Sequence, residues 1–148
     1  MKKFSFILAG MLFSGVASAA LTLNGSDEVL MTECGLLNED VMINLTNGVV
    51  GGVGCDEANN VVTLAACHTS GKNTNRTVGK KPDPNPTAPA GSTVDCTIGQ
   101  ADPTCAATPV DGAAMPSATT LQGTVNIQYP GLTCSAANAK TTADSLLP

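Results

Sequence analysis

The sequence predicts a small, mainly β protein that disulfides stabilise, and three observations support this fold class. Apolar and polar residues alternate over short stretches, which is typical of half-buried strands. The six cysteines form an even set, and the 15 glycines and 9 prolines supply many turns. We expect an antiparallel sheet, made of a hairpin meander at about 40–67 and a strand at about 122–129, with a long Pro/Gly-rich irregular region.

Residues 1–19 have the three parts of a cleavable secretory signal peptide. Two lysines follow the first Met, and the apolar stretch 4–16 is shorter than the roughly 20 residues that cross a bilayer. The small residues Ala-Ser-Ala come next, as signal peptidase requires. We predict cleavage after Ala19, which leaves a single secreted β-rich domain at 20–148.

The predicted mature chain begins with Ala20 instead of the cysteine that a lipoprotein signal needs, so we expect no lipid anchor. No later apolar run reaches spanning length, so we expect no membrane span. The Met-Lys-Lys start is typical of bacterial signals. These features predict a protein of the bacterial periplasm, of the cell surface or of the medium.

The meander at about 40–67 rests on alternation and on turn residues. Val41, Ile43 and Leu45 would share one face of a half-buried strand. Asn47-Gly48 follows, and this dipeptide favours a type I′ hairpin turn, in which both central residues have positive φ. We therefore expect three antiparallel strands, at 40–46, 49–55 and 61–67, with a polar turn at 56–60.

The second of these strands contains Gly51, Gly52 and Gly54. Glycine weakens a strand, which favours a bulged or irregular one. The same three residues also leave a groove over which another backbone could lie. That segment would come from this chain or from another copy.

From Gly79 onward the character of the sequence changes, since every proline lies at Pro82 or later. Residues 79–93 are predicted to form a Pro-rich extended loop or linker. Cys96 and Cys105 enclose eight residues, which predicts a small disulfide loop.

The strand at about 122–129 places Val125, Ile127 and Tyr129 on one face and polar residues on the other. A Pro-Gly turn ends it. A short helix is expected within 135–147.

The core must be thin, because the predicted mature chain keeps one Tyr and neither Phe nor Trp. Disulfides can compensate in an oxidising compartment, where each contributes about 3–4 kcal/mol in the chain-entropy model. Six cysteines allow 15 connectivities, and the sequence alone does not select one. The geometry of the meander favours the pairs Cys34–Cys55, Cys67–Cys134 and Cys96–Cys105.

No arrangement of residues predicts an active site. His68 is the one histidine, and Cys67-His68 lacks the first cysteine of a haem attachment motif. The absence of Cys-x-x-Cys argues against thioredoxin-like redox chemistry and zinc ribbons. Residues 83–87 resemble a calcium loop but lack its glycine and its distal glutamate. We expect no enzyme activity, no metal and no cofactor.

Basic residues are unevenly distributed. The predicted mature chain has five basic and twelve acidic residues, a net charge of −7. Four of the basic residues, Lys72, Arg76, Lys80 and Lys81, lie within ten positions. They form either a solvated loop or a positive patch that contacts an acidic surface. The acidic total argues against nucleic-acid binding.

These features favour an exported structural or interaction protein, such as a cell-surface, matrix or fibre subunit. It would act through protein–protein contacts with a protein partner or with copies of itself, and residues 20–24 could add to a neighbour's sheet. The alternative is a secreted or periplasmic binding module or inhibitor of a single partner, because disulfide loops present rigid surfaces.

Overall fold

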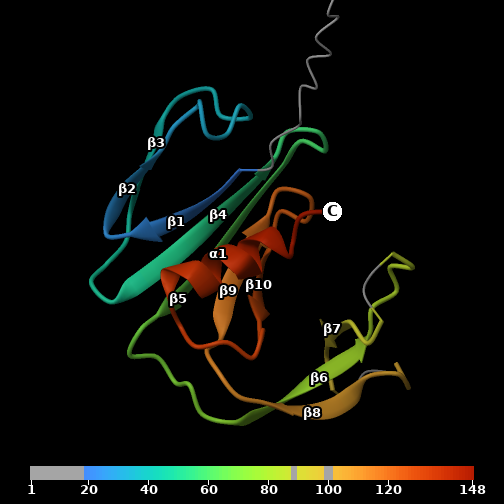
Figure 1. Cartoon of the computed structure of the whole chain (residues 1–148). Coiled ribbons are helices and arrows are strands. Elements are labelled where there is room, and N and C mark those ends of the chain that lie inside the picture. The colour runs from blue at the N-terminus through green and yellow to red at the C-terminus, as the bar shows by residue number, and fades with distance from the viewer. Residues whose placement is uncertain (1–18, 88–89, 99–101) are drawn as a thin grey trace, which may run out of the picture.

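The computed structural model describes residues 19–87, 90–98 and 102–148, so the predicted signal peptide, apart from Ala19, lies outside it. The described chain is mainly β, as the sequence predicts, with one helix (Figure 1). The elements are β1 (Ala19–Asn24), β2 (Ser26–Val29), β3 (Val41–Asn44), β4 (Val49–Asp56), β5 (Val61–His68), β6 (Arg76–Pro82), β7 (Thr93–Cys96), β8 (Ala106–Val110), β9 (Met115–Thr119), β10 (Val125–Gln128) and α1 (Ala136–Asp144).

The strands form three antiparallel sheets. The main sheet has five strands in the order β1-β4-β5-β9-β10. β2 pairs with β3, and a three-stranded sheet has the order β7-β6-β8. Figure 1 shows α1 across one face of the main sheet and the three-stranded sheet set apart below it. No helix in the described ranges is long and apolar enough to cross a membrane.

The hairpin of β4 and β5 confirms the second half of the predicted meander. The two strands pair along their whole length, with Asp56 opposite Val61. In the polar turn between them, Asp56 Oδ1 accepts hydrogen bonds from the backbone N–H groups of Ala58 (3.0 Å) and Asn59 (3.1 Å). Asn60 ends the turn with a φ of 55°, which asparagine tolerates better than most residues.

The first half of the predicted meander is wrong, because β3 pairs with β2 instead of β4. Thr46 C=O accepts a bond from Val49 N–H (2.9 Å), and Gly48 has a φ of 82° while Asn47 has no positive φ. This is the pattern of a type II turn, which splays the strands that it joins. The place beside β4 is taken by β1.

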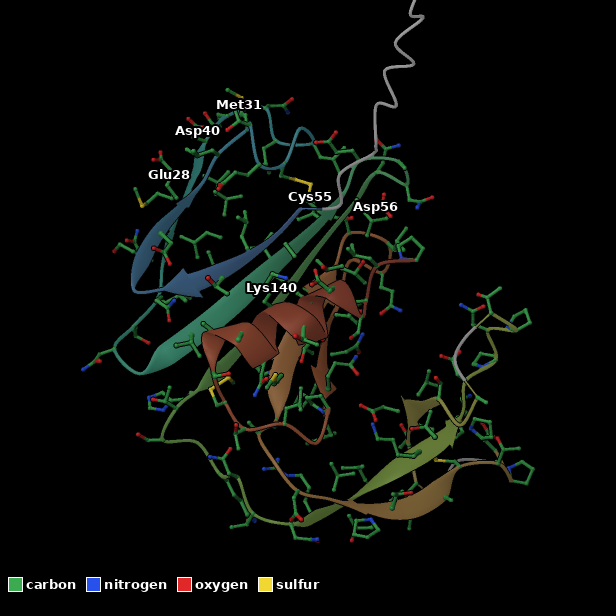
Figure 2. All side chains as sticks on the ribbon, in the orientation of Figure 1. Glu28, Met31, Asp40, Cys55, Asp56 and Lys140 are labelled. Atoms are coloured by element: carbon green, nitrogen blue, oxygen red, sulfur yellow. A yellow bond between two sulfur atoms is a disulfide. The ribbon has the colours of Figure 1, made fainter. Side chains whose placement is uncertain are left out.

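The glycines of β4 lie in a regular strand and create a packing site for α1 of the same chain. A Cβ atom on Gly52 would overlap the backbone of Lys140. Figure 2 shows Lys140 on α1, over β4. The expected short helix is thus present, and Ser135 caps it by accepting a bond from Asn138 N–H at 3.1 Å.

The three disulfides have the connectivity that the meander geometry favours: Cys34–Cys55, Cys67–Cys134 and Cys96–Cys105. The first lies in an apolar cluster with Leu23, Val29 and Val53, between the main sheet and the β2–β3 hairpin. The second lies in a cluster with Ala113 and Met115. Each apolar cluster therefore contains a covalent crosslink.

The region after Gly79 contains regular strands, and the described residues between β6 and β7, at 83–87 and 90–92, form neither strand nor helix. Residues up to Pro82 belong to β6, and Asp83 N–H still donates to Ser92 C=O (3.0 Å). Pro82 ends its strand, and Pro109 lies on the edge strand β8. At such positions the missing N–H of proline costs little, so a Pro-rich sequence can still form a sheet.

Candidate interaction surface

The two faces of the main sheet are covered to different extents. On one face, alternate residues of β5 and β9 are buried next to α1, and Thr63 Oγ1 donates to Ala143 C=O at 2.8 Å. The opposite face is covered by the β2–β3 hairpin, but only near β1 and β4. Beyond Val62, its part on β5, β9 and β10 has no second layer among the described residues. The side chains there, which we call the open face, are Leu64, Pro116, Ala118, Val125 and Ile127.

The apolar residues of β10 are exposed, although their alternation predicts a half-buried strand. Val125 is 72% exposed and Ile127 is 53% exposed. Across the sheet, Val125 lies opposite Ala118, which in turn lies opposite Leu64 (37% exposed). The open face is therefore a continuous apolar surface instead of isolated exposed residues.

The two outer strands of this surface, β9 and β10, carry no charge. Residues 112–139 contain no Asp, Glu, Lys or Arg, although the chain has nineteen such residues in all. β10 is also an edge strand, and it contains no proline. Natural sheets commonly protect exposed edges with lysine, proline or bulges. The edge at β10 has neither charge nor proline.

The hydrogen-bond pattern shows which backbone groups of β10 point outward. Thr120 N–H donates to Val62 C=O (3.0 Å), so even-numbered residues of β9 bond β5 and odd-numbered ones bond β10. Since Ser117 lies opposite Asn126, the even-numbered residues of β10 bond β9. The N–H and C=O groups of Val125 and Ile127 therefore point away from the sheet.

Tyr129 is the residue after β10, and its backbone N–H and C=O groups also point away from the sheet. Here both groups are bonded by side chains. Its N–H donates to Asp95 Oδ2 (3.3 Å), and its C=O accepts from Lys80 Nζ (3.2 Å). Lys80 and Asp95 also form an ion pair at 2.5 Å, with side chains 16% and 23% exposed. The pair thus occupies the place that the backbone of a neighbouring strand would take.

A cleft of about 930 Å³ lies between the main sheet and the three-stranded sheet. One wall is β10 with Tyr129, and the other is β7 with the residues up to Ile98. Residues 77–79 of β6, Asp83, Ser92 and Gln122 also line it, together with Ser145 and Leu146 just after α1. The two walls are both edge strands.

The four basic residues of the predicted patch do not form one free positive surface. Lys80 bonds Asp95, and Lys81 bonds Asp102 (3.0 Å). Lys72 is exposed. The role of this patch as an interaction site stays a prediction.

Arg76 holds the loop before β6. Its guanidinium donates to the backbone C=O groups of Lys72 (2.6 Å) and Gly112 (3.4 Å). It also lies over the ring of Tyr129, 5.3 Å from the centroid, in a cation–π contact. Arg76 therefore ties the three-stranded sheet to the end of the main sheet.

Sequence reasoning missed the carboxylates that pair with these lysines and placed Val125 and Ile127 on one face without predicting that this face is exposed. Asp95 and Asp102 are 15 and 21 positions from Lys80 and Lys81, so local spacing gives no sign of the pairs. One signal could have identified the open surface: the uncharged stretch at 112–139 in an acidic chain.

Within the described ranges, no group of three or more His, Cys, Asp or Glu side chains could hold a metal ion. His68 accepts a hydrogen bond at Nδ1 from Ser70 N–H (3.1 Å), a local turn contact. No protein-family model, curated protein or solved structure matches this chain. Its function must therefore be inferred from its own residues.

Proposed function

We propose that this chain is an exported structural or interaction protein, such as a cell-surface, matrix or fibre subunit, which acts through protein–protein contacts. The observation that carries the proposal is the exposure of Val125 (72%) and Ile127 (53%) on an uncharged edge strand. Fully burying side chains of this size contributes about 1.5–3 kcal/mol each. A partner that covers the open face would gain this free energy.

An extracellular location agrees with this proposal. All six cysteines are paired, and such disulfides persist in oxidising compartments. Together with the predicted signal peptide, this supports a protein that is exported, folds outside the cytoplasm and meets its partner there. The absence of charge on β9 and β10 also favours the open face as the contact surface. This chain is acidic, and an acidic partner would be repelled least at a surface without charge.

The second candidate is a secreted or periplasmic binding module or inhibitor of a single partner. The cleft of about 930 Å³ beside the open face favours it, since this volume is at the upper end of ligand-site sizes. The Cys96–Cys105 bridge restrains the chain next to that cleft, which lowers the entropy cost of binding.

The experiment removes apolar contact area without breaking the strand. The double variant Val125→Thr/Ile127→Thr keeps β-branched residues on β10, and Val41→Thr/Met42→Thr is the matched control on β3, where these residues are 37% and 55% exposed. Oxidised protein 20–148 would be analysed by light scattering over a range of concentrations. It would also be used to capture exported proteins of its own host.

We expect association with itself or with one partner to weaken at least about tenfold in the β10 variant, since each side chain loses burial. The control should associate like wild type. A wild-type protein that stays monomeric and captures nothing, or equal association of both variants, would contradict the proposal.

A further inference from the structure

We propose that the cleft between β10 and β7 binds one extended strand of a partner protein. The strand would join the main sheet and the three-stranded sheet into one continuous sheet. This inference rests on the proposed function and names the kind of partner that it requires. It is argued from the hydrogen-bond groups of the two walls, the size of the cleft and its charge.

The first wall presents backbone groups in strand geometry that have no hydrogen-bond partner among the described residues. The N–H and C=O groups of Val125 and Ile127 point outward from β10, and Ile127 lines the cleft. An extended peptide can bond such a row directly, as in β-strand addition. Its side chains would then alternate between the two faces of the sheet.

The second wall, β7, also has backbone groups that point into the cleft. The N–H of Asp83 donates to the C=O of Ser92, and bonded pairs alternate along an antiparallel ladder. The next bonded pair is therefore Val94 with Lys81 of β6. The backbone groups of Thr93 and Asp95 therefore point away from β6. Both residues line the cleft. One inserted strand could thus be bonded on both of its edges.

The protein already imitates such a strand at one end of the cleft. Lys80 and Asp95 bond the outward C=O and N–H of Tyr129 with their side chains. This ion pair defines where an inserted strand must stop. The groups of Ile127 and Val125 lie two and four residues before Tyr129, and the inserted strand would pair with them.

The size of the cleft suits a short strand. β7 and β10 have four residues each, which correspond to about 13 Å of extended chain at roughly 3.3 Å per residue. A volume of about 930 Å³ lies at the upper end of ligand-site sizes, which leaves room for a short peptide. An occupant of four to six residues, a common strand length, is therefore expected.

The charged residues that line the cleft indicate which side chains the inserted strand should carry. Asp83 and Asp95 are the two charged residues in the described lining of the cleft, and Lys80 neutralises Asp95. The partner strand should therefore be uncharged along β10 and carry a Lys or Arg beside Asp83. Ile127 and Ile98 (50% exposed) favour apolar side chains at alternate positions.

The occupant comes from another protein because the described strands of this chain are all paired within it. This includes β1, the segment that the sequence suggested as a donor to a neighbour, which pairs with β4 instead. A second copy has no unpaired strand among these elements either. Binding of a copy would require one of its sheets to open.

The test uses a synthetic probe: an acetylated and amidated peptide of alternating threonine and valine with one terminal lysine. Its matched control has the same sequence with N-methyl groups on alternate backbone nitrogens, which removes half of the donors and keeps the side chains. Each peptide would be titrated to millimolar concentration into oxidised ¹⁵N-labelled protein 20–148. Chemical shifts and amide exchange would be followed by NMR.

We expect binding of the unmodified peptide, with shifts and slower exchange at Val125, Ile127 and Thr93. The N-methylated peptide should bind at least about tenfold more weakly, because edge hydrogen bonds are lost. This comparison needs no variant, so it does not depend on how substitutions affect folding. Absence of binding by the unmodified peptide, or equal binding of the two peptides, would overturn the proposal.

Two proline variants locate the site. Ile127→Pro removes an outward N–H without removing a bond to β9, and the affinity should fall at least about tenfold. Thr22→Pro likewise removes an outward N–H at the opposite edge, on β1. The N–H of Thr69 donates to the C=O of Gly48 (2.7 Å), so even-numbered residues of β4 bond β5 and odd-numbered ones bond β1. Thr22 lies opposite Gly52, and its N–H therefore points away from the sheet. The affinity of this variant should stay within about twofold of wild type.

Equal weakening by both proline variants would overturn the assignment of the site. The inference and the proposed function can also fail separately. If the peptide does not bind but Val125→Thr/Ile127→Thr still abolishes association, the open face acts without strand insertion. If association is also insensitive to that variant, the proposed function fails as well.

Discussion

The two edge strands of the main sheet, β1 and β10, carry similar sequence patterns and lie in opposite environments. β1 contains Leu21-Thr22-Leu23, and β10 contains Val125-Asn126-Ile127, so both alternate apolar and polar residues. Leu23 is 1% exposed, whereas Val125 is 72% exposed. The alternation determines which residues share a face, but a second layer determines whether that face is buried.

The second layer at β1 is local in sequence. β1 continues through Gly25 into the β2–β3 hairpin, which folds back so that Val29 and Cys34 pack against Leu23. β10 continues through Gly131 toward α1, and α1 covers the other face of the sheet. The open face is thus left without a covering element. An exposed apolar surface of this kind is typical of a contact site.

The largest effect should come from shortening one apolar side chain at each edge. Leu23→Ala leaves a cavity in the core and should lower the free energy of unfolding by about 2–5 kcal/mol. Ile127→Ala should change it by about 0.5 kcal/mol or less, because the side chain already contacts water. Urea unfolding of oxidised protein checks both values. Equal losses at the two edges would mean that β10 is covered as well as β1.

The three-stranded sheet offers a further contrast with the β1 edge. It has a thin apolar layer, and ion pairs contribute to its stability. Hydrogen bonds from Thr104 and then from Lys81 hold the pKa of Asp102 at about 2, below its ordinary value of 3.8. The ionised form is therefore favoured in the folded state. Its contribution to stability is present above pH of about 4 and is lost as the pH falls toward 2.

Asp102→Asn should consequently lower Tm slightly at pH 7, and the difference from wild type should vanish near pH 2. Glu39→Gln removes the same charge from an exposed position outside the ion pairs and serves as the control. Calorimetry between pH 2 and 7 measures both. A deficit that persists unchanged at pH 2 would show that the carboxylate acts through packing and not through charge.

Much of the fold could be predicted because its signals are local. Alternation and turn residues place β4, β5 and β10 close to their observed bounds. The pairing of Cys34 with Cys55 was predicted from a meander whose first strand pairing is wrong; in the structure it joins the segment between β2 and β3 to β4. What local patterns do not specify is which strand pairs with which. β1 displaces β3 from β4 because a type II turn at Gly48 separates the two strands.

The candidate surface was predicted only in part, for the same physical reason. Lys80 is recognisable as a basic residue, but its partners Asp95 and Tyr129 approach it only after two sheets have formed. The exposure of Ile127 depends on where α1 packs, which its own strand does not encode. Long-range contacts of this kind shape the candidate surface, and short sequence windows do not contain them.

Amide hydrogen exchange along β10, in oxidised protein 20–148 without a partner, tests most directly whether this strand is an open edge. We predict that the outward amides of Val125 and Ile127 exchange at least about tenfold faster than those of Asn126 and Gln128, which bond β9. Uniformly slow exchange along the strand would contradict the account, because it would mean that another element already covers this edge.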